Sequence, residues 1–354
     1  MRYITSNLFR RTSMGRAQRG FGLVEIMVSL VIGAILVGGI IQVFLANKQN
    51  YRVQESLARL QESGRFAVNF LADDIRMAGY MGGARLGKSE VNVIVDPPND
   101  IDFSLDTVVR GYVNDGGLLS PAYEGFIPGY GVPTNIRADT DMLSIQYADS
   151  CGAYVNDHDN NNANVQVAGT NTCGFQQNEH LLISDGSTAD IFCNTNNPVG
   201  QGVNDTAAHS NGCNIDNRLS KIYGPSSQVY RLLVREYYIG TNADGRSALY
   251  RRDRNGAQEL VEDVVDMQLL YGINNPISTR PNVDRYVDAA NVNVSDWANI
   301  TSIRINLLVE SSDDFLTTAP QSYVFNGATV TPADQRLRRV FTATVNVRNR
   351  TLGY

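Results

Sequence analysis

The pattern of apolar and polar positions divides the chain into three parts. In the first, no residue from Ile26 to Ala46 carries a charge, and valine, isoleucine and leucine dominate. A bilayer is spanned by a helix of roughly 20 apolar residues. We therefore expect residues 21–46 to form a transmembrane helix.

The second part, residues 47–80, continues as an amphipathic helix. Small or apolar residues recur here at spacings of three and four, which places them on one helical face. They are Val53, Leu57, Leu60, Gly64, Ala67, Leu71, Ile75 and Ala78. The stripe does not keep the regular heptads of a coiled coil. We expect it to pack on the protein's own globular domain, and the glycines from Gly79 to Gly83 to end the helix.

The third part, residues 81–354, has the alternating pattern of β-strands. The strand-length segments are residues 141–149, 228–240, 247–253, 264–273, 302–311 and 339–349. Two of them have one apolar face each, formed by Ile303, Ile305, Leu307 and Val309 and by Phe341, Ala343, Val345 and Val347. These faces are expected to cover the amphipathic helix. Residues 258–272 stay ambiguous, because Leu260, Val261, Val264 and Val265 are also spaced for a short helix.

The predicted fold class is therefore α+β: a long N-terminal transmembrane and amphipathic helix packed on an antiparallel β-sheet. Its first apolar turn contains one acid, Glu25. An ionised carboxylate inside a membrane span costs about 2.5 to 3.5 kcal/mol and usually has a partner. Ahead of it, residues 1–20 hold five arginines and no acid, which favours a cytoplasmic N-terminus and an exported domain.

The junction between leader and apolar run resembles a known signal. Residues 19–36, RGFGLVEIMVSLVIGAIL, are similar to the type III signal of type IV prepilins. The resemblance implies that residues 1–20 are a leader peptide and that a prepilin peptidase cuts between Gly20 and Phe21. It further implies N-methylation of Phe21 and pairing of Glu25 with the Phe21 amine of a neighbouring subunit. An uncut signal-anchor is the alternative.

Segments along the rest of the chain narrow this resemblance. Residues 71–83, 140–150, 259–272, 297–311 and 336–350 resemble the PilW group of minor pilins. This implies a structural and assembly-priming subunit of a type IV pilus tip complex. Its partners would be other minor pilins, the major pilin and a PilY-type tip adhesin. It would lie in the inner membrane before assembly, then in the pilus at the cell surface.

The nearest alternative is a J-type pseudopilin of a type II secretion or DNA-uptake apparatus, whose soluble domain acts as a binding module. Such proteins are usually shorter than this chain of 354 residues.

The cysteines all lie in one Asn- and Gly-rich stretch, residues 150–217. Their spacing is too wide for zinc-binding hooks, and an even count in an exported chain favours disulfides among Cys151, Cys173, Cys193 and Cys213. Of three connectivities we favour the neighbouring pairs, Cys151 with Cys173 and Cys193 with Cys213; crossed pairing stays open. We expect a disulfide-stapled, loop-rich insertion that cannot bury much apolar surface on its own. Residues 181–185 and 190–193 are expected to anchor it as short strands. It is either a contact surface for a tip partner or a tolerated loop.

Catalytic and cofactor motifs are absent from the sequence. His158, His180 and His209 lie in the insertion without catalytic spacing, and no phosphate-binding loop or nucleophile elbow occurs. Neither an enzyme nor a cofactor is therefore expected. The acid pairs Asp73–Asp74 and Asp313–Asp314 are expected to be solvated.

Ion and nucleic-acid binding are also not expected. Asp157, Asp159 and Asn161 have the spacing that begins a calcium loop, but Asn162 replaces its glycine and Ala168 its final glutamate. The net charge of −6 becomes −11 once the five leader arginines are removed, which disfavours phosphate contacts.

Overall fold

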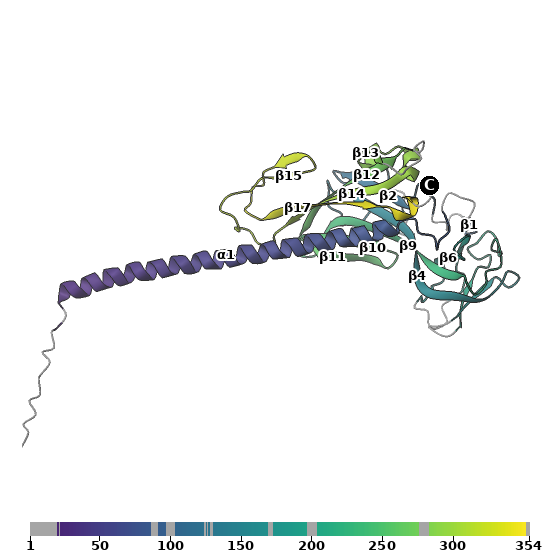
Figure 1. Ribbon diagram of the computed structural model, residues 1–354, viewed down its shortest axis with the longest axis horizontal. Helices are drawn as coiled ribbons and strands as arrows, with labels where there is room; N and C mark the ends of the chain where they lie inside the picture. The colour runs from purple at the N-terminus through teal and green to yellow at the C-terminus, as the bar shows by residue number, and fades with distance from the viewer. Residues whose placement is uncertain are drawn as a thin grey trace, which may run out of the picture. The chain divides into compact units, whose positions relative to one another are not determined.

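The computed structural model describes residues 20, 22–85, 91–96, 103–123, 125, 127, 130–168, 173–196, 204–275 and 283–351. The chain divides into two compact units, Met1–Gln54 and Glu55–Tyr354. The second unit contains the sheets and the end of the long helix (Figure 1).

Helix α1 (Leu23–Met77) begins in the first unit and ends in the second. A run of apolar residues without proline favours its first half despite Gly33, Gly38 and Gly39, and the amphipathic stripe favours its second half. Gly79 follows the helix with a φ of 74°. This left-handed conformation is open to glycine at little cost, and it ends the helix.

The larger sheet is built around two long strands, β4 and β9. Among the described residues it has 11 strands, seven of them paired in the order β1-β7-β6-β9-β4-β2-β3. Of the other four, β10 pairs with β9 and β11 with β10, whereas β5 pairs with β4 and β8 with β5. Its strands are β1 (Val91–Val93), β2 (Val109–Asp115), β3 (Leu118–Ser120), β4 (Met142–Asp159), β5 (Asn164–Ala168), β6 (His180–Ser184), β7 (Ala189–Cys193), β8 (Asn204–Ala208), β9 (Gln228–Thr241), β10 (Ser247–Asp253) and β11 (Gly256–Glu262). Only the β1–β7 pairing among these is parallel.

The smaller sheet is antiparallel and has the order β13-β12-β14-β17. Its strands are β12 (Val264–Asn274), β13 (Val283–Val287), β14 (Ile300–Glu310) and β17 (Arg338–Asn346). A hairpin of β15 (Tyr323–Phe325) and β16 (Ala328–Val330) lies between β14 and β17 in the chain. Short helices complete the fold: the 3₁₀ helices η1 (Ala289–Asn291) and η2 (Val294–Asn299), and α2 (Arg348–Thr351).

The second half of α1 packs on both sheets, as the pattern of apolar positions predicts. Its stripe is buried from Leu60 to Ala78 in one cluster with Ile303, Ile305, Leu307 and Val309. The predicted face of the last strand is confirmed where Phe341 packs against this cluster. Figure 1 shows α1 running beside β10, β14 and β17. The first turns of the stripe are less covered, since Leu57 stays 39% exposed.

The ambiguous segment, residues 258–272, forms two strands with a turn at Asp263 between them, so the short helix is wrong. Leu260 and Val261 belong to β11, and Val264 begins β12, which pairs with β14. Between the strands, Asp263 has a φ of 64°. A right-handed helix does not continue through such a residue.

Candidate functional site

The first turn of α1 places one carboxylate at the start of an apolar helix. The Glu25 amide donates to the carbonyl of Gly22 at 3.0 Å, and the Ser29 hydroxyl donates to the carbonyl of Glu25 at 2.7 Å. These hydrogen bonds stabilise the backbone of the first helical turn and do not involve the Glu25 carboxylate. No ion pair within the described residues involves the Glu25 carboxylate.

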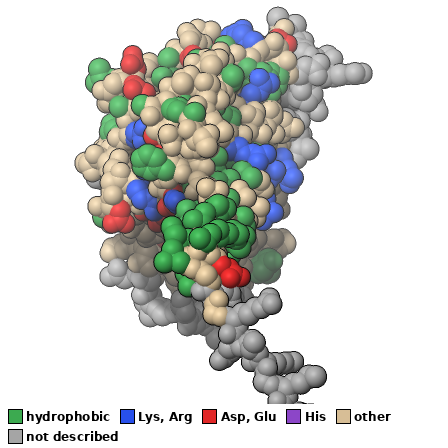
Figure 2. Space-filling view, turned by 90° about the vertical axis from the view of Figure 1, so that its left-hand side faces the viewer, with side chains coloured by type: hydrophobic (Ala, Val, Ile, Leu, Met, Phe, Trp, Pro, Cys, Tyr) green, Lys and Arg blue, Asp and Glu red, His purple; other side chains and the backbone are tan. Residues whose placement is uncertain are grey.

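The apolar side chains after Glu25 are exposed on all sides of the helix. From Leu23 to Leu45 the large hydrophobic residues are 51% to 74% exposed, and end-on the beginning of the helix is a hydrophobic cluster (Figure 2). Among the described residues, α1 is the one helix long and apolar enough to cross a membrane. A surface of this kind is covered by lipid or by other apolar helices.

The predicted processing site lies mostly outside the described residues. Leader residues up to 19 and Phe21 are not described, whereas Gly20 is an exposed residue just before the helix. Cleavage after Gly20, methylation of Phe21 and the pairing of Glu25 therefore stay predictions.

The second half of α1 is anchored by a buried acid, Asp74. Its carboxylate accepts hydrogen bonds from Tyr147 at 2.9 Å and from Arg235 at 2.7 Å, and a further one from Tyr237. Asp74 is only 7% exposed, so the prediction of a solvated Asp73–Asp74 pair is wrong for this residue. Burial, and secondarily the charge of Asp74, raises the pKa of Tyr147 and Tyr237. Both hydroxyls therefore stay protonated and donate.

The insertion contains both disulfides and contributes most residues of one buried cluster. Cys151 is bonded to Cys173 and Cys193 to Cys213, which is the neighbouring pairing favoured from the sequence. The expected anchor strands are present as β6 and β7. A buried cluster joins Ile94, Ala153, Val155, Val165, Val167, Cys173, Phe175, Leu181, Ile183, Phe192, Ala207, Leu219, Tyr223 and Val229. The insertion thus buries apolar surface in a cluster that it shares with Ile94, Leu219, Tyr223 and Val229, which lie outside it.

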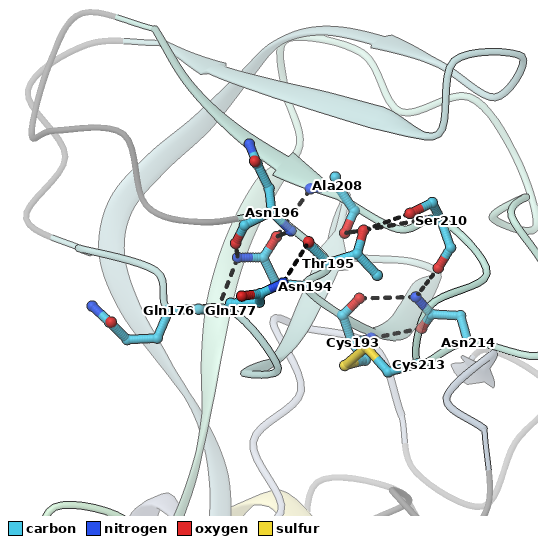
Figure 3. Close-up of a disulfide and its surroundings, with 10 residues drawn as sticks. All are labelled: Gln176, Gln177, Cys193, Asn194, Thr195, Asn196, Ala208, Ser210, Cys213 and Asn214. Carbon is cyan, nitrogen blue, oxygen red and sulfur yellow. Dashed lines mark hydrogen bonds between the residues drawn. A yellow bond between two sulfur atoms is a disulfide. The ribbon is translucent and has the colours of Figure 1, made fainter.

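Asparagine side chains complete the backbone hydrogen bonds around the second disulfide. Asn214 accepts from the Cys193 amide at 2.7 Å and donates to the Cys193 carbonyl at 2.9 Å. Asn194 accepts from the Ala208 amide at 3.0 Å and donates to the Gln176 carbonyl at 3.0 Å. Figure 3 shows Asn214 directed toward the backbone of Cys193 and Asn194 directed toward neighbouring backbone groups. Asparagine can donate and accept at once, so an Asn-rich composition is compatible with a folded structure here.

A cavity of about 540 Å³ lies where the insertion meets the turn between β10 and β11. The Cys193–Cys213 disulfide, Leu232 and Val234 line it on the apolar side. At its rim the buried Glu179 pairs with Arg231 at 3.0 Å and Arg254 at 3.3 Å. These ion pairs join the insertion to β9 and to the β10–β11 hairpin.

His158, His209 and Asp159 of the insertion take part in ring contacts and hydrogen bonds within the fold. The rings of His158 and His209 are 5.5 Å apart, and the Tyr223 amide donates to Nδ1 of His158. Asp159 accepts from the Asn161 amide at 2.9 Å and closes a hairpin turn. Within the described residues, no group of three or more His, Cys, Asp or Glu side chains is arranged to hold a metal ion.

Comparison with known families gives two matches. The family described as type IV pilus-assembly protein W matches residues 236–349, from β9 to α2. The prokaryotic N-terminal methylation motif matches residues 15–41, which contain Gly20, Phe21 and Glu25. Searches of characterised proteins and of solved structures found no match.

The two matches cover two features described above: the exposed start of α1 and the strands on which its second half packs. The methylation motif covers the exposed apolar start of α1 with its lone acid. The other match covers β12, β14 and β17, on which the second half of α1 packs. Together the two matches support a type IV pilus minor pilin of the PilW family, anchored in the membrane by its apolar N-terminal helix and later assembled into the pilus.

Proposed function

We propose that this minor pilin is a structural and assembly-priming subunit of the pilus tip complex. A prepilin peptidase removes residues 1–20 after Gly20 and methylates the new N-terminus at Phe21. The inner membrane holds α1 until assembly. Other minor pilins, the major pilin and a PilY-type tip adhesin are the proposed partners.

The observation that carries the proposal is Glu25, which forms no ion pair with any residue that the structure describes and lies in an exposed apolar helix. A carboxylate in a low-dielectric environment is tolerated when an opposite charge lies close to it. Cleavage before Phe21 creates an amine, and this amine in a neighbouring subunit is the proposed partner. A subunit in the wrong position would leave both charges unpaired, which is costly. The pair would therefore set the position of one subunit along another.

The globular unit is proposed to face the tip partners. Its insertion has a buried cluster and two disulfides, which suits a surface exposed outside the cell. The ion pairs of Glu179 hold the insertion to the rest of the sheet. The contact surface is thereby presented in a fixed orientation.

Substitution of Glu25 tests the pairing. Glu25→Gln removes the charge but keeps the size, and we expect at least about a tenfold loss of the protein from sheared filaments, equivalent to about 1.4 kcal/mol. Membrane insertion should be unchanged, because removing an acid favours the span. The amounts in filament and membrane fractions are measured by immunoblot.

Ser29→Ala is the matched control, because it removes a polar group one turn away without changing the charge. Its filament fraction should equal that of the wild type. Equal incorporation of Glu25→Gln and wild type would contradict the pairing mechanism.

A deletion strain separates the tip role from that of a J-type pseudopilin. Loss of surface pili with normal protein secretion supports the pilus subunit. Normal piliation with a secretion defect would instead support the secretion or uptake apparatus.

A further inference from the structure

One edge of the smaller sheet is open. Within the part of the chain that the structure describes, β17 pairs with β14 and with no other strand. Its sequence RRVFTATVN contains no proline, and its charged residues are confined to Arg338 and Arg339 at its start. Edge strands are commonly protected by such residues, by a bulge or by a covering segment. On its outer side, alternate N–H and C=O groups of β17 therefore lack a strand partner.

A groove runs along this open edge. It has a volume of about 560 Å³ and is lined by Gln61, Glu62, Arg65, Val68 and Asn69 of α1 and by Arg339, Phe341 and Thr342 of β17. Figure 1 shows β17 beside α1.

The apolar part of the groove is formed by close contact of strand and helix. A Cβ atom added to Gly64 would lie 2.2 Å from the ring of Phe341. The ring thus lies directly on the helix backbone, and Val68 is half-buried nearby. A side chain that enters the groove at this point would meet apolar atoms on both sides.

The charged part of the groove is basic. Neither Arg65 nor Arg339 forms an ion pair within the described ranges, and each lies 5.9 Å from the ring of a phenylalanine. Arg338, one residue earlier, instead pairs with Glu310 at 2.7 Å and with Asp334 at 2.6 Å. Of the groove-lining residues, Glu62 is the only acid. The two available guanidinium groups favour an acidic ligand.

We propose that β17 and α1 accept an extended segment of another polypeptide as a fifth strand of the smaller sheet. Main-chain hydrogen bonds to the free edge of β17 supply the affinity, and the side chains that point toward α1 supply the specificity. Among these, an apolar residue lies between Val68 and Phe341, and an acidic residue lies between Arg65 and Arg339. The inference concerns the domain alone and does not depend on the tip role.

Synthetic peptides test this strand addition on the full-length chain in detergent micelles. In the acidic probe, threonine occupies every second position, and valine or aspartate occupies the positions between. A second probe has lysine in place of aspartate, and a third is the acidic peptide with alternate amides N-methylated. By fluorescence anisotropy, the acidic probe should bind at least about tenfold more tightly than either of the others. Failure of the acidic probe to bind, or equal binding of all three probes, would overturn the proposal.

Charge reversal locates the binding site. The double variant Arg65→Glu with Arg339→Glu should lose the acidic probe and bind the lysine probe, with an unchanged circular dichroism spectrum. Arg304→Glu is the control, since Arg304 lies on β14 of the same sheet but stacks on Tyr286. Its affinity should stay within about twofold. Equal affinity of the double variant and the control would place the peptide elsewhere. Since the assay uses purified protein, its failure leaves the proposed filament role standing.

Discussion

Asp74 illustrates how a single polar residue fixes the position of the long helix. It shares the buried face of α1 with Leu71 and Ile75, and there it accepts from Tyr147, Tyr237 and Arg235. The sequence contains the signal for this burial, because position 74 is three residues after Leu71 and four before Ala78. The identity of the partners was not readable, since they come from strands about 70 and 160 positions further along.

Replacement of Asp74 should be much more costly than replacement of Asp73. We expect Asp74→Ala to lower the free energy of unfolding by about 3 to 5 kcal/mol, because it leaves Arg235 without its buried partner. Asp73 has a side chain 76% exposed and pairs with Arg76 on the surface, so Asp73→Ala should cost less than about 1 kcal/mol.

Urea denaturation of the full chain in detergent measures both values. The single tryptophan, Trp297, lies in the same core and reports its unfolding by fluorescence. Equal midpoints for the two variants would contradict the anchoring role of Asp74.

At the element scale, the amino-acid composition of the insertion was a poor guide to how much apolar surface is buried there. The insertion has few apolar residues. Ala153 and Val155 of β4 nevertheless join its buried cluster, together with Val165 and Val167 of the paired strand β5. Each of these segments is short when read alone. The core forms because the pairing of β4, β5, β6 and β9 brings them together, and that pairing is not encoded locally.

The same core should make the insertion sensitive to acid. His209 is 0% exposed, and burial, with the nearby His158, lowers the pKa of His209 from 6.5 to about 4. The unfolded state then binds more protons than the folded state between these two values. Stability is therefore expected to fall as the pH falls from about 6.5 to 4, and His158 contributes in the same direction.

Urea midpoints followed by circular dichroism at pH 7 and pH 4.5 check this pH dependence. His209→Gln cannot take up the proton, so its midpoint should fall less between the two values than that of the wild type. An equal fall in both proteins would exclude His209 as a source of the pH dependence.

At the scale of the whole molecule, the long helix and the strand faces that it contacts could be predicted from local patterns in the sequence. The apolar run, the stripe from Leu60 to Ala78 and the faces of β14 and β17 all appear as periodic positions in the sequence. The order of the strands was not readable, because β1 pairs with β7 and β4 with β9 across long separations. The open edge of β17 likewise becomes visible only once the pairing is known.

The account depends most on how the mature chain begins. Glu25 has a role in assembly only if processing exposes the amine of Phe21. The intact mass of the protein from sheared filaments, with the mass of its N-terminal peptide, measures this directly. We predict a chain that starts at N-methylated Phe21, and an unprocessed chain in cells without the prepilin peptidase. A filament-derived chain that retains its leader, or that starts at any other residue, would contradict the account.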